Sequence, residues 1–180
     1  MLKKIVIIGP ESTGKSTLCE QLAAHYKTAW CPEYARAYLL KHGNTYNYDN
    51  LLTIAKGQVA LEDKYIAKMS VPGLRSGLLF IDTDMYVMKV WCEFVFGKCP
   101  RFILDQITER KYDLYLLCNT DLPWVKDELR EYPDLKTRER LYHIYKDIMI
   151  GQEVPWIEIS GNNEDRLLKA IDAVDLFLKN

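Results

Sequence analysis

The chain has 180 residues, 48% of them hydrophobic, which suits one α/β domain and leaves no room for a second of ordinary size. Its 24 basic and 25 acidic residues give a formal net charge of −1, without the basic excess expected of a nucleic-acid-binding protein. No apolar run approaches the roughly 20 residues of a membrane span. From the charge balance we therefore expect no nucleic-acid partner, and from the short apolar runs no membrane partner.

The first predicted strand, Ile5–Ile8, is apolar throughout and leads directly into the motif G-x-x-x-x-G-K-S at residues 9–16. A helical pattern follows at once, over residues 16–26, so the motif stands between strand and helix as a phosphate-binding P-loop does. A chance match of the four fixed positions would occur in well under about 1% of random chains of this length. The sequence therefore predicts binding of a nucleoside triphosphate.

The residue types of the loop fit this role. Gly9 and Gly14 allow backbone angles that let successive N–H groups turn inward and bind an anion. Lys15 supplies a mobile charge for the β- and γ-phosphates, and the Ser16 hydroxyl is placed to ligate Mg²⁺. Glu11 is unusual there, because its charge has to point away from the phosphates, and a ribose hydroxyl is one partner it could have. The predicted ATP-binding residues are Gly9, Glu11, Ser12, Thr13, Gly14, Lys15, Ser16 and Thr17.

Strands and helices alternate along the rest of the chain. Further strands are predicted at 28–31, 78–81, 114–118 and 156–159, and helices at 33–41, 50–69, 85–96, 102–109, 141–150 and 164–178, with Val71-Pro72-Gly73 ending the second of these. Such alternation predicts a three-layer α/β sandwich around a five-stranded parallel sheet, with right-handed crossovers. We expect residues 1–180 to form a single P-loop domain.

Each predicted strand ends in a polar cluster. These clusters are the P-loop and residues 32–33, 82–84, 119–124 and 160–163. Because the carboxyl ends of parallel strands meet at one edge of a sheet, and ligands bind there, the five clusters should surround one site.

Asp82 ends an apolar strand, as the Walker-B acid of P-loop phosphotransferases does. It is predicted to hold Mg²⁺ directly or through water, so the candidate metal ligands are Ser16 and Asp82. Asp84 lies close enough to share this task or to contact the substrate. Both acids could instead cap the helix that follows, and the two roles are compatible.

Glu33 and Arg36 follow the second strand, at a spacing that puts them on neighbouring sides of one helical turn. A kinase acting on a small alcohol needs a carboxylate near the acceptor hydroxyl and a cation to steady charge. Glu33 is therefore a candidate catalytic and substrate-binding residue, and Arg36 a substrate-binding one. The alternatives are a Glu that complements the helix dipole and a solvated Arg.

The charged segment after the fourth strand is predicted to be a lid, at approximately residues 121–140. When such a lid closes it excludes water, and Arg130, with Lys126 or Arg138 in reserve, could reach the transferred phosphate. A solvated helix face is the alternative. Tyr34 and Trp124 lie beside the expected acceptor pocket, where aromatic rings would suit a flat, cationic base. The predicted catalytic residues are Lys15, Asp82, Glu33 and Arg130, and the predicted substrate-binding residues are Glu33, Tyr34, Arg36, Asp84 and Trp124.

Five cysteines are scattered along the chain without C-x-x-C spacing, and this pattern indicates buried thiols in a reducing compartment. The amino-terminal residues pass straight into a strand without a small-residue cleavage site. Both features predict a cytoplasmic protein.

Several segments together resemble the ribosylnicotinamide kinase domain of NadR-type proteins. They are Gly-Pro-Glu-Ser-Thr-Gly-Lys-Ser-Thr (9–17), Pro-Glu-Tyr-Ala-Arg (32–36), Ile-Ala-Lys-Gly-Gln (54–58), Phe-Ile-Asp-Thr-Asp (80–84), Asp-Leu-Pro-Trp (121–124), Leu-Arg-Glu (129–131) and Ile-Ser-Gly-Asn-Asn-Glu-Asp-Arg (159–166). The resemblance extends over essentially the whole chain, in order.

This resemblance implies a nucleoside/nucleotide-kinase-like fold with strands ordered 2-3-1-4-5. It also implies transfer of the ATP γ-phosphate, with Mg²⁺, to the 5′-hydroxyl of nicotinamide riboside, giving nicotinamide mononucleotide in NAD biosynthesis. No H-x-G-H signature is present, so adenylyl transfer is not implied. Two other classes remain open, namely a kinase for another nucleoside or nucleotide, and an ATP-binding switch protein that is not a kinase.

Overall fold

In a computed structural model of the chain, described for residues 2–69 and 77–179, five strands alternate with seven helices. The strands are β1 (Lys3–Ile8), β2 (Ala29–Cys31), β3 (Leu78–Asp82), β4 (Leu114–Cys118) and β5 (Trp156–Ile159). The helices are α1 (Lys15–His25), α2 (Tyr34–His42), α3 (Tyr48–Met69), α4 (Met85–Phe96), α5 (Arg101–Glu109), α6 (Leu135–Gly151) and α7 (Asn163–Lys179).

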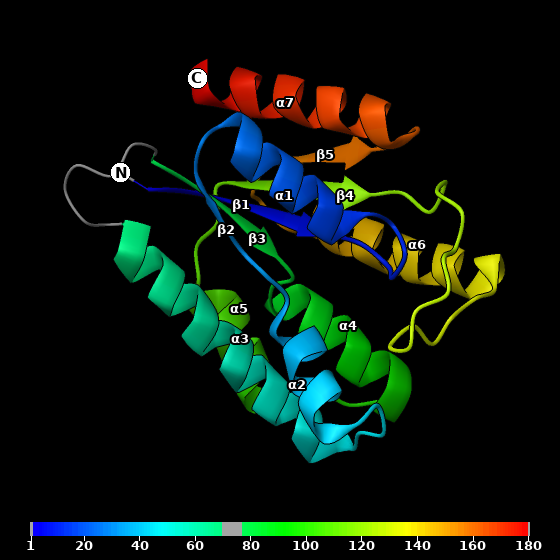
Figure 1. Cartoon of the computed structure of the whole chain (residues 1–180). Helices are drawn as coiled ribbons and strands as arrows, with labels where there is room; N and C mark the ends of the chain where they lie inside the picture. Colours follow the sequence, from blue (N-terminus) through cyan, green and yellow to red (C-terminus); the bar gives the residue numbers. More distant parts are fainter. Residues whose placement is uncertain (1, 70–76, 180) are drawn as a thin grey trace.

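The strands form one parallel sheet in the order β2-β3-β1-β4-β5, which confirms the expected topology (Figure 1). The three central strands are apolar along almost their whole length because helices cover both faces of the sheet. β1 lies in the middle, between β3 and β4, so the loop that follows it emerges at the centre of the carboxyl edge.

Alternate residues of β1 belong to two separate cores. Ile5 and Ile7 pack with buried side chains of α1 and α7 on one face of the sheet. Val6 and Ile8 pack with side chains of α4 and α6 on the other face. The period of two in a strand thus produces a three-layer α/β/α sandwich, as Figure 1 shows.

A third apolar cluster joins α2, α3, α4 and α5 beside the sheet. It includes Leu39 of α2, Ile54 of α3, Met88 of α4 and Ile103 of α5, all buried. Figure 1 shows these helices extending below the β2–β3 side of the sheet. These four helices form a helical wall beside the sheet.

Two predicted helix starts lie two or more residues from the observed ones. α6 begins at Leu135 and not at residue 141, because the Asp134 side chain accepts a hydrogen bond from the Thr137 N–H at 2.7 Å and caps the helix. α3 begins at Tyr48 and not at residue 50, because Asn47 and Asn50 cap it reciprocally, each side chain accepting from the other's backbone N–H. The predicted stop at residues 71–73 lies outside the described residues.

All five cysteines are free thiols, and Cys19, Cys31, Cys92 and Cys118 are buried. Within residues 2–69 and 77–179, no helix combines the length and the hydropathy needed to cross a bilayer.

Candidate active site

The P-loop has a conformation that depends on its glycines. Gly9 has φ of +140°, and a Cβ there would lie 2.7 Å from the Cys118 carbonyl oxygen. Gly14 is in the left-handed region, with φ of +76°, directly before α1. The Thr13 hydroxyl donates to the Pro10 carbonyl at 2.7 Å, and Lys15 Nζ donates to the same oxygen at 2.8 Å. The loop thus wraps around the amino end of α1, where free N–H groups and the helix dipole favour an anion.

The hydroxyl at the start of α1 meets the acid at the end of β3. Ser16 Oγ donates to Asp82 Oδ2 at 2.5 Å, and Asp82 is fully buried. Burial raises the pKa of Asp82, while Lys15 and the Ser16 hydrogen bond act in the opposite direction. A hydroxyl and a carboxylate are hard oxygen donors of the kind Mg²⁺ prefers. The two predicted metal ligands therefore lie together, and their chemistry fits that ion.

Glu33 lies between β2 and α2 and faces the same cavity as Lys15. Burial, followed by repulsion from Asp82, raises the pKa of Glu33 to about 7, although Lys15 and Arg36 lower it. A carboxyl with this pKa exchanges its proton near neutral pH, as a general base for a hydroxyl must.

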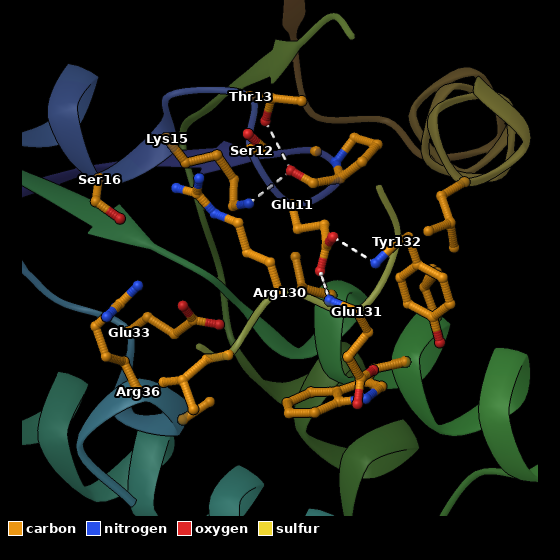
Figure 2. A pocket seen from close by; sticks show the side chains of 18 of the residues that line it. Glu11, Ser12, Thr13, Lys15, Ser16, Glu33, Arg36, Arg130, Glu131 and Tyr132 are labelled. Atoms are coloured by element: carbon orange, nitrogen blue, oxygen red, sulfur yellow. Dashed lines mark hydrogen bonds between the residues drawn. The ribbon is translucent and has the colours of Figure 1, made fainter. Parts of the chain in front are cut away.

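A cavity of about 340 Å³ extends from the P-loop to the helical wall at the carboxyl edge of the sheet (Figure 2). Its size is in the range of small-molecule sites. The predicted residues that line it are Gly9, Glu11, Ser12, Thr13, Gly14, Lys15, Ser16, Thr17, Glu33, Arg36 and Arg130. These residues come from the P-loop, the start of α2 and the loop before α6, so the fold brings three distant parts of the chain to one site.

The loop before α6, residues 119–134, lies against the P-loop. Trp124 Nε1 and the backbone N–H groups of Glu131 and Tyr132 all donate to the Glu11 carboxylate. The last six residues of the predicted lid, 135–140, belong to α6 and not to this loop. From α2, Arg36 forms an ion pair with Asp127 of the loop at 2.6 Å, and this lowers the pKa of Asp127.

The far end of the cavity contains side chains that the sequence did not single out. Trp91 Nε1 donates to the Tyr46 hydroxyl, which donates to Glu131 Oε2, each at 2.8 Å. Phe94 and Tyr132 also line this end, where their rings meet at right angles 5.5 Å apart. Trp91 lies in a predicted helix, and Tyr46 lies between two predicted helices, so no motif pointed to either.

Some predicted site residues are placed elsewhere. Asp84 is a buried helix cap: it accepts from the N–H groups of Tyr86 and Val87, and from the Tyr115 hydroxyl at 2.8 Å. Tyr34 packs its ring over Gly57, where a Cβ would lie 2.1 Å from the ring.

Neither Tyr34 nor Asp84 lines the cavity, and Trp124 touches it only through its bond to Glu11. Of the two reserve lid cations, Arg138 is buried and donates to the Leu122 carbonyl at 3.4 Å, and Lys126 is exposed. Neither of them lines the cavity.

The raised pKa of Glu33 makes stability depend on pH. Because the pKa in the folded state exceeds the ordinary value of 4.5, the protonated form stabilises the fold, and this contribution is lost as the pH rises from about 4.5 to about 7. The glutamine in Glu33→Gln stays neutral at every pH. The melting temperature of this variant, relative to that of the wild type, should therefore rise by roughly 2–6 °C between pH 5 and pH 8. Glu20→Gln, an exposed change on α1, is the control. Parallel pH curves for Glu33→Gln and the wild type would show that Glu33 is ionised throughout.

The sheet order and the glycine loop define the class of protein: a P-loop NTPase fold of the nucleoside/nucleotide-kinase type. The family model described as "AAA domain" matches residues 4–166, and the chain belongs to this family.

Curated relatives include the "Trifunctional NAD biosynthesis/regulator protein NadR" of Escherichia coli K12 and of Salmonella typhimurium LT2, each 28% identical over 96% of the chain. The chain spans 42% of the length of both relatives. The resemblance to NadR-type proteins is thus confirmed by sequence comparison.

Solved structures share the fold. A NadR protein in complex with NR superposes with a TM-score of 0.79 and 20% identity, covering 98% of this chain and 49% of that one. The same values, apart from a TM-score of 0.76, hold for a NadR protein in complex with NAD and AMP-PNP. Thymidylate kinase from Ehrlichia chaffeensis has a TM-score of 0.63 at 16% identity, covering 96% of this chain and 98% of that one.

Proposed function

We propose that this protein is a kinase that transfers the γ-phosphate of ATP to the 5′-hydroxyl of nicotinamide riboside, forming nicotinamide mononucleotide for NAD biosynthesis. The observation that carries the proposal is the cavity itself, which joins a P-loop to carboxylates and aromatic rings. The relatives support it: one NadR structure contains NR, which we take as nicotinamide riboside, and another contains an ATP analogue. Since the chain covers less than half of the NadR proteins, we propose only the kinase activity.

On the donor side, the P-loop N–H groups and Lys15 would bind the β- and γ-phosphates. Ser16 and Asp82 would hold Mg²⁺, which would supply positive charge against the charge that develops during transfer. Ser16 Oγ and Asp82 Oδ2 lie 2.5 Å apart beside the loop. Positioning and charge stabilisation supply most of the catalysis in phosphoryl transfer, so this arrangement suits the reaction.

On the acceptor side, Glu33 would position the 5′-hydroxyl and accept its proton. Its pKa of about 7 matches that task. Arg36 of α2 and Arg130 of the loop before α6 both line the cavity (Figure 2). Either guanidinium can steady the charge on the transferred group.

The far end of the cavity suits a flat, cationic base. Trp91, Phe94 and Tyr132 supply ring surface, and the Glu131 carboxylate lies among them. The attraction between a cation and an aromatic ring is worth about 0.5–2 kcal/mol, which is roughly a two- to thirty-fold preference over a neutral base of similar shape. Tyr34, Asp84 and Trp124, which the sequence also suggested for substrate contact, do not line the cavity.

The alternative is a kinase for another nucleoside or nucleotide, which the likeness to thymidylate kinase keeps open. ADP release measured with and without each nucleoside separates the possibilities. Strong stimulation by nicotinamide riboside supports the proposal, and stimulation by another nucleoside alone overturns the acceptor assignment. Slow ADP release that no acceptor stimulates overturns the kinase and favours the switch protein.

Arg130 should matter for the transferred phosphate more than for acceptor binding. We expect Arg130→Ala to lower kcat about 10-fold, a loss of about 1.4 kcal/mol in the transition state, and to leave the acceptor KM nearly unchanged. Arg101→Ala is the matched control, because the Arg101 side chain is 87% exposed on α5 and does not line the cavity. If both variants lost the same activity, the effect of Arg130 would be one of general charge.

We further propose that residues 1–180 act as one domain in the cytoplasm, with residues of the 121–140 region serving as a lid. The five free thiols agree with a reducing compartment. The contacts of residues 124–132 with the P-loop support the lid.

A further inference from the structure

Glu11 is a carboxylate in a loop that otherwise attracts phosphate. Lys15, the start of α1 and the inward N–H groups favour a negatively charged ligand, and a fixed negative charge opposes it. The negative charge of Glu11 therefore disfavours the binding of a nucleotide's phosphates. Figure 2 shows where its carboxylate is directed: toward the chain at Glu131 and Tyr132.

Three N–H groups converge on this carboxylate. Tyr132 N donates to Oε1 at 2.7 Å, Trp124 Nε1 donates to Oε1 at 3.2 Å, and Glu131 N donates to Oε2 at 2.9 Å. All three donors belong to residues 124–132, which we call the lid segment. The neighbouring Ser12 adds a fourth contact, because its Oγ accepts from Val125 N at 3.0 Å.

The same segment extends to the other end of the cavity. Glu131 is held by its backbone at Glu11, and its side chain accepts from the Tyr46 hydroxyl, which in turn accepts from Trp91 Nε1. Arg130 directly precedes Glu131, and its Nη1 donates to the Val125 carbonyl at 2.5 Å, so its guanidinium is held within the same segment. The Glu11 carboxylate thus connects the P-loop, through Glu131, with Tyr46 and Trp91.

We propose that Glu11 is a positioning residue: its carboxylate docks the lid segment on the P-loop and so holds Arg130 and Glu131 over the cavity. This role rests on the proposed kinase function, which gives Arg130 and Glu131 their tasks. A carboxylate suits the role because both of its oxygens accept, and three N–H groups need acceptors. A glutamine offers one accepting oxygen and presents an NH₂ group to the remaining donor.

The first experiment follows amide hydrogen exchange by NMR, with a non-hydrolysable ATP analogue bound and no acceptor present. In Glu11→Ala, the amides of Glu131 and Tyr132 should exchange about 10-fold faster or more than in the wild type, with Glu11→Gln intermediate. Glu20→Gln makes the same charge change on the exposed face of α1 and should match the wild type. Unchanged exchange at both amides in Glu11→Ala overturns the proposal.

The second experiment measures what the lid segment does for catalysis. With nicotinamide riboside and ATP, Glu11→Ala should lower kcat about 10-fold and raise the ratio of ATP hydrolysed to acceptor phosphorylated, because an undocked lid admits water. A loss of fold stability alone would not change that ratio. A rise in acceptor KM with kcat and the ratio unchanged would mean that Glu11 contacts the substrate, and would overturn the positioning role.

The two experiments also separate the two proposals. If the wild-type protein forms no nicotinamide mononucleotide, the proposed function fails, yet the exchange measurement still decides whether Glu11 docks the lid segment, because it uses no acceptor. If the wild type is an active kinase and the exchange is unchanged in Glu11→Ala, the positioning role alone fails.

Discussion

Lys15→Ala should reduce phosphotransfer by a factor of about 10³ or more while the fold remains intact. Stabilising charge on a transferring phosphoryl group is worth several kcal/mol, and Lys15 is the cation that the P-loop itself supplies. The fold should tolerate the change because the Pro10 carbonyl, which Lys15 Nζ contacts, also accepts from the Thr13 hydroxyl at 2.7 Å. The measurement is the initial rate at saturating ATP and acceptor, with the melting temperature recorded alongside.

The matched control for this prediction is Lys64→Ala. Lys64 is exposed on α3 and lies outside the cavity, so its loss removes the same charge without touching the site. Near-wild-type turnover in Lys15→Ala would remove the P-loop lysine from the mechanism.

Asp82→Asn should cut the rate by roughly 10²–10³-fold and weaken its dependence on Mg²⁺, while triphosphate binding stays measurable. An asparagine oxygen can still accept from the Ser16 hydroxyl, but it brings no charge to a cation. Because burial raises the pKa of Asp82, its ionised form is costly in the fold, and the neutral side chain should not lower the melting temperature. Rates measured over a series of Mg²⁺ concentrations test both parts.

Asp147→Asn, on the exposed face of α6, is the control for Asp82→Asn. If Asp82→Asn lowers only the melting temperature and leaves the rate unchanged, the acid serves the fold and not the reaction.

The parts of the structure that local sequence specifies were predictable. The apolar run of β1, the glycine spacing of the P-loop and the alternation of strands and helices together led to the sheet, and the resemblance supplied the order of its strands. Lys15, Ser16 and Glu33 line one cavity and Asp82 bonds to Ser16, and this grouping followed from one rule, that the carboxyl ends of parallel strands meet. Each of these inferences uses neighbours in the sequence or a general property of the fold.

The remaining features depend on contacts between residues far apart in the chain. Glu11 meets Trp124 and Tyr132, more than 110 positions away, and Trp91 meets Tyr46 of a loop whose path no local pattern specifies. The start of α6 was missed for a similar reason. Its first turns are rich in charge and look solvated, although Arg138 is buried and donates to the Leu122 carbonyl.

Asp84 illustrates how one sequence position can raise two expectations of which the structure shows only one. Both a site role and a helix-cap role were predicted, and the structure shows the cap, with two N–H donors and the Tyr115 hydroxyl around the carboxylate. Burial raises its pKa to about 6. Neither Asp84 nor Asp82 lines the cavity, but Asp82 accepts from the hydroxyl of Ser16, which does. The hydroxyl that donates to Asp84 belongs to Tyr115, which does not line it.

The most direct test of the central claim is a competition among acceptors. Nicotinamide riboside, uridine, adenosine and thymidine are supplied at equal concentration with ATP and Mg²⁺, and the products are identified by mass spectrometry. We expect nicotinamide mononucleotide to be the main product, because the carboxylate and rings at the far end of the cavity favour a cationic base. Efficient phosphorylation of another nucleoside without formation of nicotinamide mononucleotide would contradict the acceptor assignment and leave only the kinase fold.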